Sequence, residues 1–253
     1  MKTFVYRLYQ LLVAAPLIIV ATILTAVVTT IGCTVGNGHF WGYWPGRIWA
    51  WFICRVLLIP VKVEGREHLE PGTSYVFVAN HQGAFDIFLV YGFLNRNFKW
   101  MMKQSLRRVP FVGLACKASH QVFVNKTSKS GIANTYSEAR NILKSGMSLM
   151  VFPEGARTFT GHMGFFRRGA FALADELQLP VVPMTINGSF DILPRTRGVN
   201  FVRRCPLTLT IHQPIPPKGN GAEDIRQTME QSYDAIMAAL PEDYQGYVEN
   251  KDQ

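Results

Sequence analysis

The pattern of apolar and polar positions divides the chain into two parts. Residues 11–33 form an uncharged apolar run, and a second apolar segment extends from Arg47 to Val63. The first run has the roughly 20 apolar residues that a membrane-spanning helix needs. The second is shorter and carries Arg55 in its middle, which favours an interfacial or re-entrant helix. We therefore predict membrane-anchoring helices over residues 1–60.

Two processing signals are alternatives to a retained anchor. The apolar run is longer than the hydrophobic part of a secretory signal peptide and lacks a clear A-x-A site. The residues before Cys33 resemble a lipoprotein cleavage site only weakly, because Thr30 stands where leucine is expected. Lys2 and Arg7 precede the run, so the positive-inside rule places the N-terminus in the cytoplasm. We expect an inner (cytoplasmic) membrane protein whose main domain faces the cytoplasm.

From residue 61 onward the pattern alternates between short β-branched or aromatic runs and stretches with helical spacing. Alternating strands and helices are typical of an α/β fold, so we predict a mixed, largely parallel sheet flanked by helices over residues 61–253. The predicted strands are Tyr75–Ala79, Gln121–Val124, Ser148–Phe152, Val181–Ile186 and Leu207–Ile211, and the predicted helices are Phe85–Leu94, Phe111–Lys117, Ser130–Lys144, Arg168–Leu177 and Ala222–Leu240.

Composition narrows the possible partners. Lys and Arg total 26 against 17 Asp and Glu, which gives a formal charge of +9. With no nucleic-acid-binding motif in the sequence, this balance favours anionic membrane lipids or an anionic substrate over nucleic acid. The four cysteines are widely spaced and the six histidines form no ligand cluster. We therefore predict neither a disulfide framework nor a structural metal.

A histidine and an aspartate follow the first predicted strand of the main domain. In open α/β sheets, ligands bind beyond the carboxyl ends of the strands, which is where His81 and Asp86 lie. The two side chains can meet if His81 sits in the turn and Asp86 comes from the first helical turn, and Gly83 would ease that turn. Asp86 would then hold the Nδ1 proton and leave Nε2 as a base for an alcohol. The alternative is a surface loop with a capping aspartate.

A second polar segment, FPEGARTF, follows the predicted strand Ser148–Phe152. It places Glu154 and Arg157 in a loop that contains Gly155. The planar guanidinium of Arg157 suits a phosphate group, although a solvated basic loop would give the same pattern. The sequence has no GxSxG elbow, which argues against a serine nucleophile, and no GxxxxGK[ST] loop, which argues against a P-loop nucleotidase. His81 is then a candidate base without a nucleophile from the protein. Such a site favours transfer to an alcohol supplied by the substrate.

These segments give the chain a resemblance to a known family. NHQGAFD matches the NHxxxxD block, and FPEGARTF the FPEG-x-R block, of the 1-acylglycerol-3-phosphate acyltransferases within the wider glycerolipid acyltransferases. Lys103 with the following VPFVG, and Val182-Pro183, resemble two weaker blocks in the same order. The resemblance covers residues 61 to 215.

The resemblance implies an enzyme that transfers a fatty acyl group to the sn-2 hydroxyl of lysophosphatidic acid and forms phosphatidic acid. It implies that His81 is the general base and Asp86 its partner, that Glu154 and Gly155 shape the acceptor site, and that Arg157 and Lys103 bind the acceptor phosphate. The donor would be acyl-CoA or an acylated acyl carrier protein, and no cofactor would be needed.

One block departs from the family pattern. Where the family often has G-x-x-F-x-x-R, this chain has His120 in place of the glycine and Lys126 in place of the arginine. Lysine keeps the charge but lacks the bidentate fork. Another lysophospholipid or a lyso-aminolipid is therefore an alternative acceptor, and a catalytically inactive membrane scaffold is the alternative outside enzymes.

Overall fold

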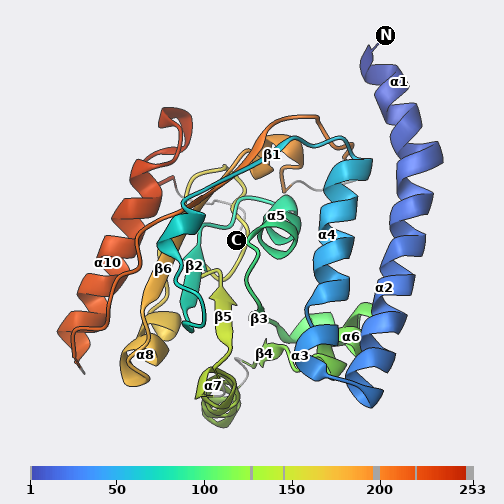
Figure 1. The fold of residues 1–253 in the computed structure, drawn as a ribbon. Coiled ribbons are helices and arrows are strands. Elements are labelled where there is room, and N and C mark those ends of the chain that lie inside the picture. The colour runs from blue at the N-terminus through green and yellow to red at the C-terminus, as the bar shows by residue number, and fades with distance from the viewer. Residues whose placement is uncertain (1, 126–127, 145, 196–199, 220, 249–253) are drawn as a thin grey trace.

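The computed structural model describes residues 2–125, 128–144, 146–195, 200–219 and 221–248. A long N-terminal helix stands along one side of a twisted sheet, and other helices cover the sheet (Figure 1). In chain order the elements are α1 (Lys2–Tyr9), the π-helix η1 (Gln10–Ala14), α2 (Ala15–Val35), α3 (Gly38–Trp41), α4 (Trp44–Val56), β1 (Val61–Glu64), η2 (Arg66–His68), β2 (Val76–Ala79), α5 (Phe85–Phe93), β3 (Phe98–Lys103), η3 (Gln104–Arg108), α6 (Val112–Ala118), β4 (Val122–Val124), α7 (Lys129–Lys144), β5 (Ser148–Val151), α8 (Gly169–Glu176), β6 (Val181–Asn187), α9 (Ser189–Ile192), β7 (Leu207–Ile211), α10 (Ala222–Ala238) and η4 (Glu242–Tyr244).

The strands form one sheet in the order β1-β7-β6-β2-β5-β3-β4. Every neighbouring pair is parallel except β6 and β7. The predicted mixed, largely parallel sheet is thus confirmed, and each predicted strand has a counterpart with bounds shifted by a residue or so. The strands β1 and β3 were not predicted. In β3, the buried Lys99 interrupts the apolar run that marks a central strand.

The N-terminal apolar run belongs to one continuous helix. Residues Thr3–Val35 form a helix long and apolar enough to cross a membrane. The second apolar segment was predicted to be a helix to Val63, but this is wrong at its end. The helix α4 stops at Val56, and Val61 begins the sheet, because Pro60 cannot donate a backbone hydrogen bond and ends the helical stretch.

These N-terminal helices pack against the sheet domain. Ile53 and Cys54 of α4 share one hydrophobic cluster with Phe77 of β2 and Phe85 of α5. The N-terminal helix adds polar contacts, since the Gln10 side chain both donates to and accepts from the backbone of Val202 at 2.9 Å. The predicted division at residue 60 stays a prediction, but the described helices and sheet share this core.

The sheet order brings three strand ends together. The strands β2, β5 and β3 are neighbours and run in parallel, so their carboxyl ends lie at one edge. The segments that follow them begin with Asn80, Phe152 and Gln104. The two polar segments predicted from the sequence therefore meet at this edge.

Candidate active site

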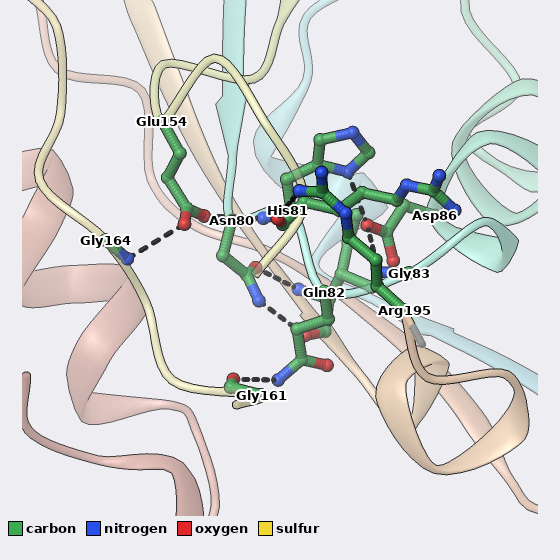
Figure 2. Close-up of polar contacts among 11 residues, drawn as sticks. Asn80, His81, Gln82, Gly83, Asp86, Glu154, Gly161, Gly164 and Arg195 are labelled. Atoms are coloured by element: carbon green, nitrogen blue, oxygen red, sulfur yellow. Dashed lines mark hydrogen bonds and ion pairs between the residues drawn. The ribbon is translucent and has the colours of Figure 1, made fainter. Parts of the chain in front are cut away.

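His81 and Asp86 are in direct contact. The Nδ1 atom of His81 lies 2.7 Å from Oδ2 of Asp86 (Figure 2). Because a carboxylate only accepts hydrogen bonds, Nδ1 carries the hydrogen and Nε2 has a free lone pair. Asp86 is completely buried, whereas 14% of the His81 side chain is exposed. The pair therefore presents one basic nitrogen at the sheet edge.

Gly83 serves this pair in a way that the sequence did not reveal. It was predicted to ease the turn through its conformational freedom, but it does not have a positive φ. Instead its backbone N–H donates to Oδ2 of Asp86 at 2.9 Å, and a Cβ here would lie 2.5 Å from the Ser189 hydroxyl oxygen. Glycine is needed because α9 packs directly against this turn.

Aromatic rings connect His81 to an apolar cavity. The imidazole stacks on Phe152 with 3.9 Å between ring centroids, and Phe152 stacks on Trp100 at 5.7 Å. Trp100 also lines a cavity between the N-terminal helices and α6. Other residues of its wall are Thr25, Ala26, Trp49, Met102, Val112 and Ala115. The rings of Phe152 and Trp100 would therefore separate an apolar chain held in this cavity from the imidazole of His81.

Glu154 faces the backbone and not the open site. Its two carboxylate oxygens accept from His81 N at 2.6 Å and from Gly164 N at 2.8 Å (Figure 2). Burial raises the pKa of Glu154 to about 8, although both N–H donors act in the opposite direction. Glu154 thus fixes the backbone of His81 and links it to Gly164.

Gly155 and Arg157 form the rest of this loop. Gly155 has a φ of +78°, a left-handed conformation that glycine adopts without strain. The residue after Arg157, Thr158, donates its backbone N–H to the carbonyl of His81 at 3.0 Å. The loop that carries Arg157 is therefore tied to the His81 turn.

Arg195 is a basic residue of this region that the sequence did not single out. Its Nη1 donates to the carbonyl of Arg157 at 2.8 Å, and its guanidinium lies over the ring of Phe159, 3.9 Å from the centroid. Figure 2 shows its side chain extending toward the loop around His81. Arg195 follows α9, more than 30 residues beyond the FPEGARTF segment, so no local spacing linked it to the site.

Lys103 ends β3 at the same edge of the sheet but farther from the histidine. It is exposed, and its strand is separated from β2 by β5. Within the described ranges, no hydrogen bond or ion pair joins Lys103 to His81 or Arg157. In the departing block, His120 is exposed with a φ of +52°, and Lys126 lies outside the described residues.

Comparisons with known proteins assign the family. The family model described as "Acyltransferase" matches residues 60–187, about half of the chain and all of the site segments except Arg195. The chain belongs to this acyltransferase family.

Two relatives of this acyltransferase are named for the same activity. This chain is 29% identical over 220 residues to the 1-acyl-sn-glycerol-3-phosphate acyltransferase of Saccharomyces cerevisiae. The match covers 85% of this chain and 72% of the yeast protein. The chain is 29% identical over 187 residues to a Chlamydomonas reinhardtii protein of the same name, covering 74% of this chain and 54% of the algal one. This acyltransferase thus spans between about half and three quarters of the length of these two relatives.

A solved structure has the same fold. The crystal structure of the 1-acyl-sn-glycerophosphate acyltransferase PlsC from Thermotoga maritima superposes with a TM-score of 0.72 at 23% identity. The match covers 96% of this chain and 100% of the Thermotoga chain, so it includes the N-terminal helices as well as the sheet.

Proposed function

We propose that this acyltransferase moves a fatty acyl group from a thioester donor to the free sn-2 hydroxyl of lysophosphatidic acid, giving phosphatidic acid. The observation that carries the proposal is the 2.7 Å contact between His81 Nδ1 and Asp86, which leaves Nε2 as a base. The family assignment supports acyl transfer, and the names of the yeast and algal relatives support this acceptor.

In the proposed mechanism, Nε2 of His81 removes the proton from the acceptor hydroxyl as the oxygen attacks the thioester carbonyl. A C–O bond forms, the C–S bond breaks, and the imidazolium returns its proton to the leaving thiolate. Asp86 stabilises the imidazolium through the Nδ1 hydrogen bond. Holding both substrates at one edge of the sheet supplies much of the acceleration.

Three features support a phosphorylated acceptor with an apolar chain. The Arg157 loop is bound to the His81 turn, and Lys103 is exposed at the neighbouring strand end. Both cations are proposed to bind the acceptor phosphate. The cavity beyond Trp100 offers apolar walls for a fatty acyl chain.

The donor is proposed to be acyl-CoA or an acylated acyl carrier protein, and the reaction to need no metal or other cofactor. Every bond change above uses only the two substrates and side chains of this chain. A chelator such as EDTA should therefore leave the rate within about twofold of the untreated enzyme. Loss of activity that returns with a divalent cation would contradict this part of the proposal.

The deciding experiment compares wild type with His81→Ala in acyl transfer to lysophosphatidic acid in detergent, from each donor. Loss of a general base should lower kcat by at least about a hundredfold. His39→Ala is the matched control because His39 is exposed and distant along the chain. Equal rates for wild type and His81→Ala would exclude His81 as the base.

The departing block motivates a second acceptor. Since His120 and Lys126 replace the glycine and arginine of the family pattern, another lysophospholipid or a lyso-aminolipid is the second candidate. A panel of lyso-lipids under the same conditions separates the two. Activity confined to a phosphate-free acceptor would exclude lysophosphatidic acid, and no activity on any acceptor would favour a scaffold.

The long apolar helix Thr3–Val35 indicates membrane association. We propose the inner (cytoplasmic) membrane, with the catalytic domain on the cytoplasmic side. Arg7 before the apolar run supports a cytoplasmic N-terminus, and the hydrogen bond from Tyr6 to the Leu57 carbonyl brings the end of α4 back to the same side. Protease digestion of intact spheroplasts should spare the catalytic domain, and digestion of inverted vesicles should remove it.

A further inference from the structure

A surface that is both apolar and basic lies beside the N-terminal helices. It consists of the exposed residues Leu106, Arg108, Val109, Phe111, Leu114 and Lys117, which we call the η3–α6 surface. Every residue from Lys103 to Phe111 is exposed. Phe111 is 48% exposed and Leu114 59% exposed, so large apolar groups stand in solvent next to cations.

The charge of this surface has one sign. Between Ile87 and Ser137 the sequence contains no Asp or Glu, whereas Arg107, Arg108 and Lys117 flank the exposed apolar side chains. A surface helix of a soluble protein usually mixes both signs. Exposed apolar groups interspersed only with cations fit the interface of an anionic membrane.

The backbone holds this surface in one conformation. Gly113 N donates to the Val109 carbonyl at 2.8 Å, and Ala115 N to the Phe111 carbonyl at 3.0 Å. A Cβ on Gly113 would lie 2.3 Å from the Arg107 carbonyl oxygen, so the η3 turn is packed closely onto α6. Phe111 has a φ of +60°, a strained conformation for an aromatic residue, and it keeps its ring half exposed.

The surface continues the membrane element and borders the site. The helix α6 packs against α2 (Figure 1). Its residues Val112, Ala115 and Cys116 line the cavity that α2 also lines. Phe111 and Leu114 are exposed and do not line this cavity, and α2, which packs against α6, has exposed apolar residues of its own. Lys103, where the segment begins, lies at the edge of the sheet that carries His81.

We propose that the η3–α6 surface inserts its apolar side chains into an anionic lipid surface, while Arg108 and Lys117 bind lipid phosphates. Together with the N-terminal helix, it would hold the His81 edge of the sheet against the membrane. The inference rests on the proposed function only in that the acceptor is a membrane lipid. An acidic acyl carrier protein is the other partner that the charge would suit, but the apolar groups and their continuity with α2 favour lipid.

The first test measures binding without catalysis. Full-length protein in nanodiscs of phosphatidylcholine, with or without about 30% phosphatidylglycerol, is followed by amide hydrogen exchange. We expect slower exchange over residues 104–118 in the anionic nanodiscs and no change in α7. Equal exchange in both nanodiscs would overturn the proposal. So would protection of residues 104–118 that requires an acyl carrier protein and not anionic lipid.

The second test separates lipid docking from chemistry. Phe111→Ser/Leu114→Ser and Arg108→Gln/Lys117→Gln are compared with Ile132→Ser, a control whose side chain is 43% exposed on α7. Losing two cations or two apolar anchors should lower the rate on lysophosphatidic acid in anionic nanodiscs about tenfold or more. The rate on a short-chain, water-soluble lysophosphatidate should stay within about twofold. If the double variants match the Ile132→Ser control in nanodiscs, the proposal is overturned. If they lose equal activity on both acceptors, the substitutions act through a folding defect, and this result also contradicts the proposal.

Discussion

At the scale of single residues, Asp86 fixes which imidazole nitrogen of His81 carries hydrogen. In Asp86→Asn, the side-chain oxygen can still accept the Nδ1 hydrogen, but it cannot stabilise the imidazolium by charge. We expect kcat to fall by at least about a hundredfold while the KM of the acceptor changes little. Steady-state kinetics against an Asp243→Asn control, at an exposed aspartate of η4, measures this. A kcat close to that of wild type would mean that Asp86 only caps the helix.

Arg195 gives a separate prediction about the acceptor. Its guanidinium uses one N–H for the Arg157 carbonyl and has other donors that a single lysine amine cannot replace. In Arg195→Lys we expect the KM for lysophosphatidic acid to rise about tenfold with kcat largely kept. The control is Arg204→Lys, an exposed arginine that donates to the Leu58 carbonyl. A purely structural role for Arg195 would instead lower thermal stability and leave KM unchanged.

Glu154 predicts how stability depends on pH. Its pKa is raised from 4.5 to about 8 by burial, so between these values the folded state binds the proton that the unfolded state has lost. The contribution of Glu154 to the free energy of unfolding should therefore be largest at and below about pH 4.5, fall as the pH rises to about 8, and level off above. The slope from this group is at most roughly 1.4 kcal/mol per pH unit.

Thermal unfolding in detergent between pH 5 and 9 measures this slope. Glu154→Gln removes the titrating group, so its stability should decline less steeply over this window. Its stability at pH 5 should also be lower than that of wild type, because the amide NH₂ must face one of the two N–H donors. Parallel curves for the two proteins would contradict the raised pKa.

At the scale of elements, the N-terminal helix is attached by polar as well as apolar contacts. Tyr6 and Tyr9 donate to the carbonyls of Leu57 and Val56, and Gln10 bonds to Val202 in both directions. Gln10 lies at the start of the π-helix η1 and is buried. The start of this helix, before its most apolar stretch, is therefore held against the domain by hydrogen bonds.

Replacing Gln10 tests this docking. In Gln10→Leu the backbone N–H and carbonyl of Val202 lose their side-chain partner, which costs about 1–3 kcal/mol when such groups stay buried. Thermal unfolding in detergent should show a lower midpoint, with acyl transfer by the remaining folded protein unchanged. The same measurement on Leu11→Ala, at the exposed neighbouring position, gives the background effect. Equal midpoints for the two variants would argue against a structural role for the Gln10 bonds.

Elements also show where sequence reasoning succeeds. The strands β2, β5 and β6 are buried along their whole length or nearly so, and their apolar runs identified them. The strand β3 was not predicted because Lys99 interrupts its apolar run. Lys99 can be buried there since it donates to the carbonyl of Ser119, twenty positions away, and the local pattern does not show this partner. The pairing of His81 with Asp86 could be predicted since both lie in one turn. Arg195 and the carboxylate contacts of Glu154 depend on tertiary packing, which local spacing does not encode.

At the scale of the whole molecule, helices α2 and α4 belong to the same core as the sheet. Ile53 of α4 lies in one buried cluster with Phe77 and Phe98, and Ile18 of α2 packs against this cluster. A protein that lacks residues 1–41 should therefore lose stability and not simply become soluble, because it would expose the inner side of α4 and α6. We expect it to aggregate or to lack a cooperative thermal transition in detergent. A monodisperse, cooperatively unfolding truncated protein would show that the helices are only an anchor.

The pairing of β1 with β7 has a consequence for synthesis. Val61 at the start of β1 is in register with Leu207, and the buried Gln10 bonds to Val202 across 192 positions. The first helix leaves the ribosome long before either partner exists. While the chain is being made, the apolar helix can enter the membrane, but β1 has no strand to pair with, and such non-local pairing slows folding. The nascent domain therefore has an open strand edge at the bilayer until the last fifth of the chain emerges.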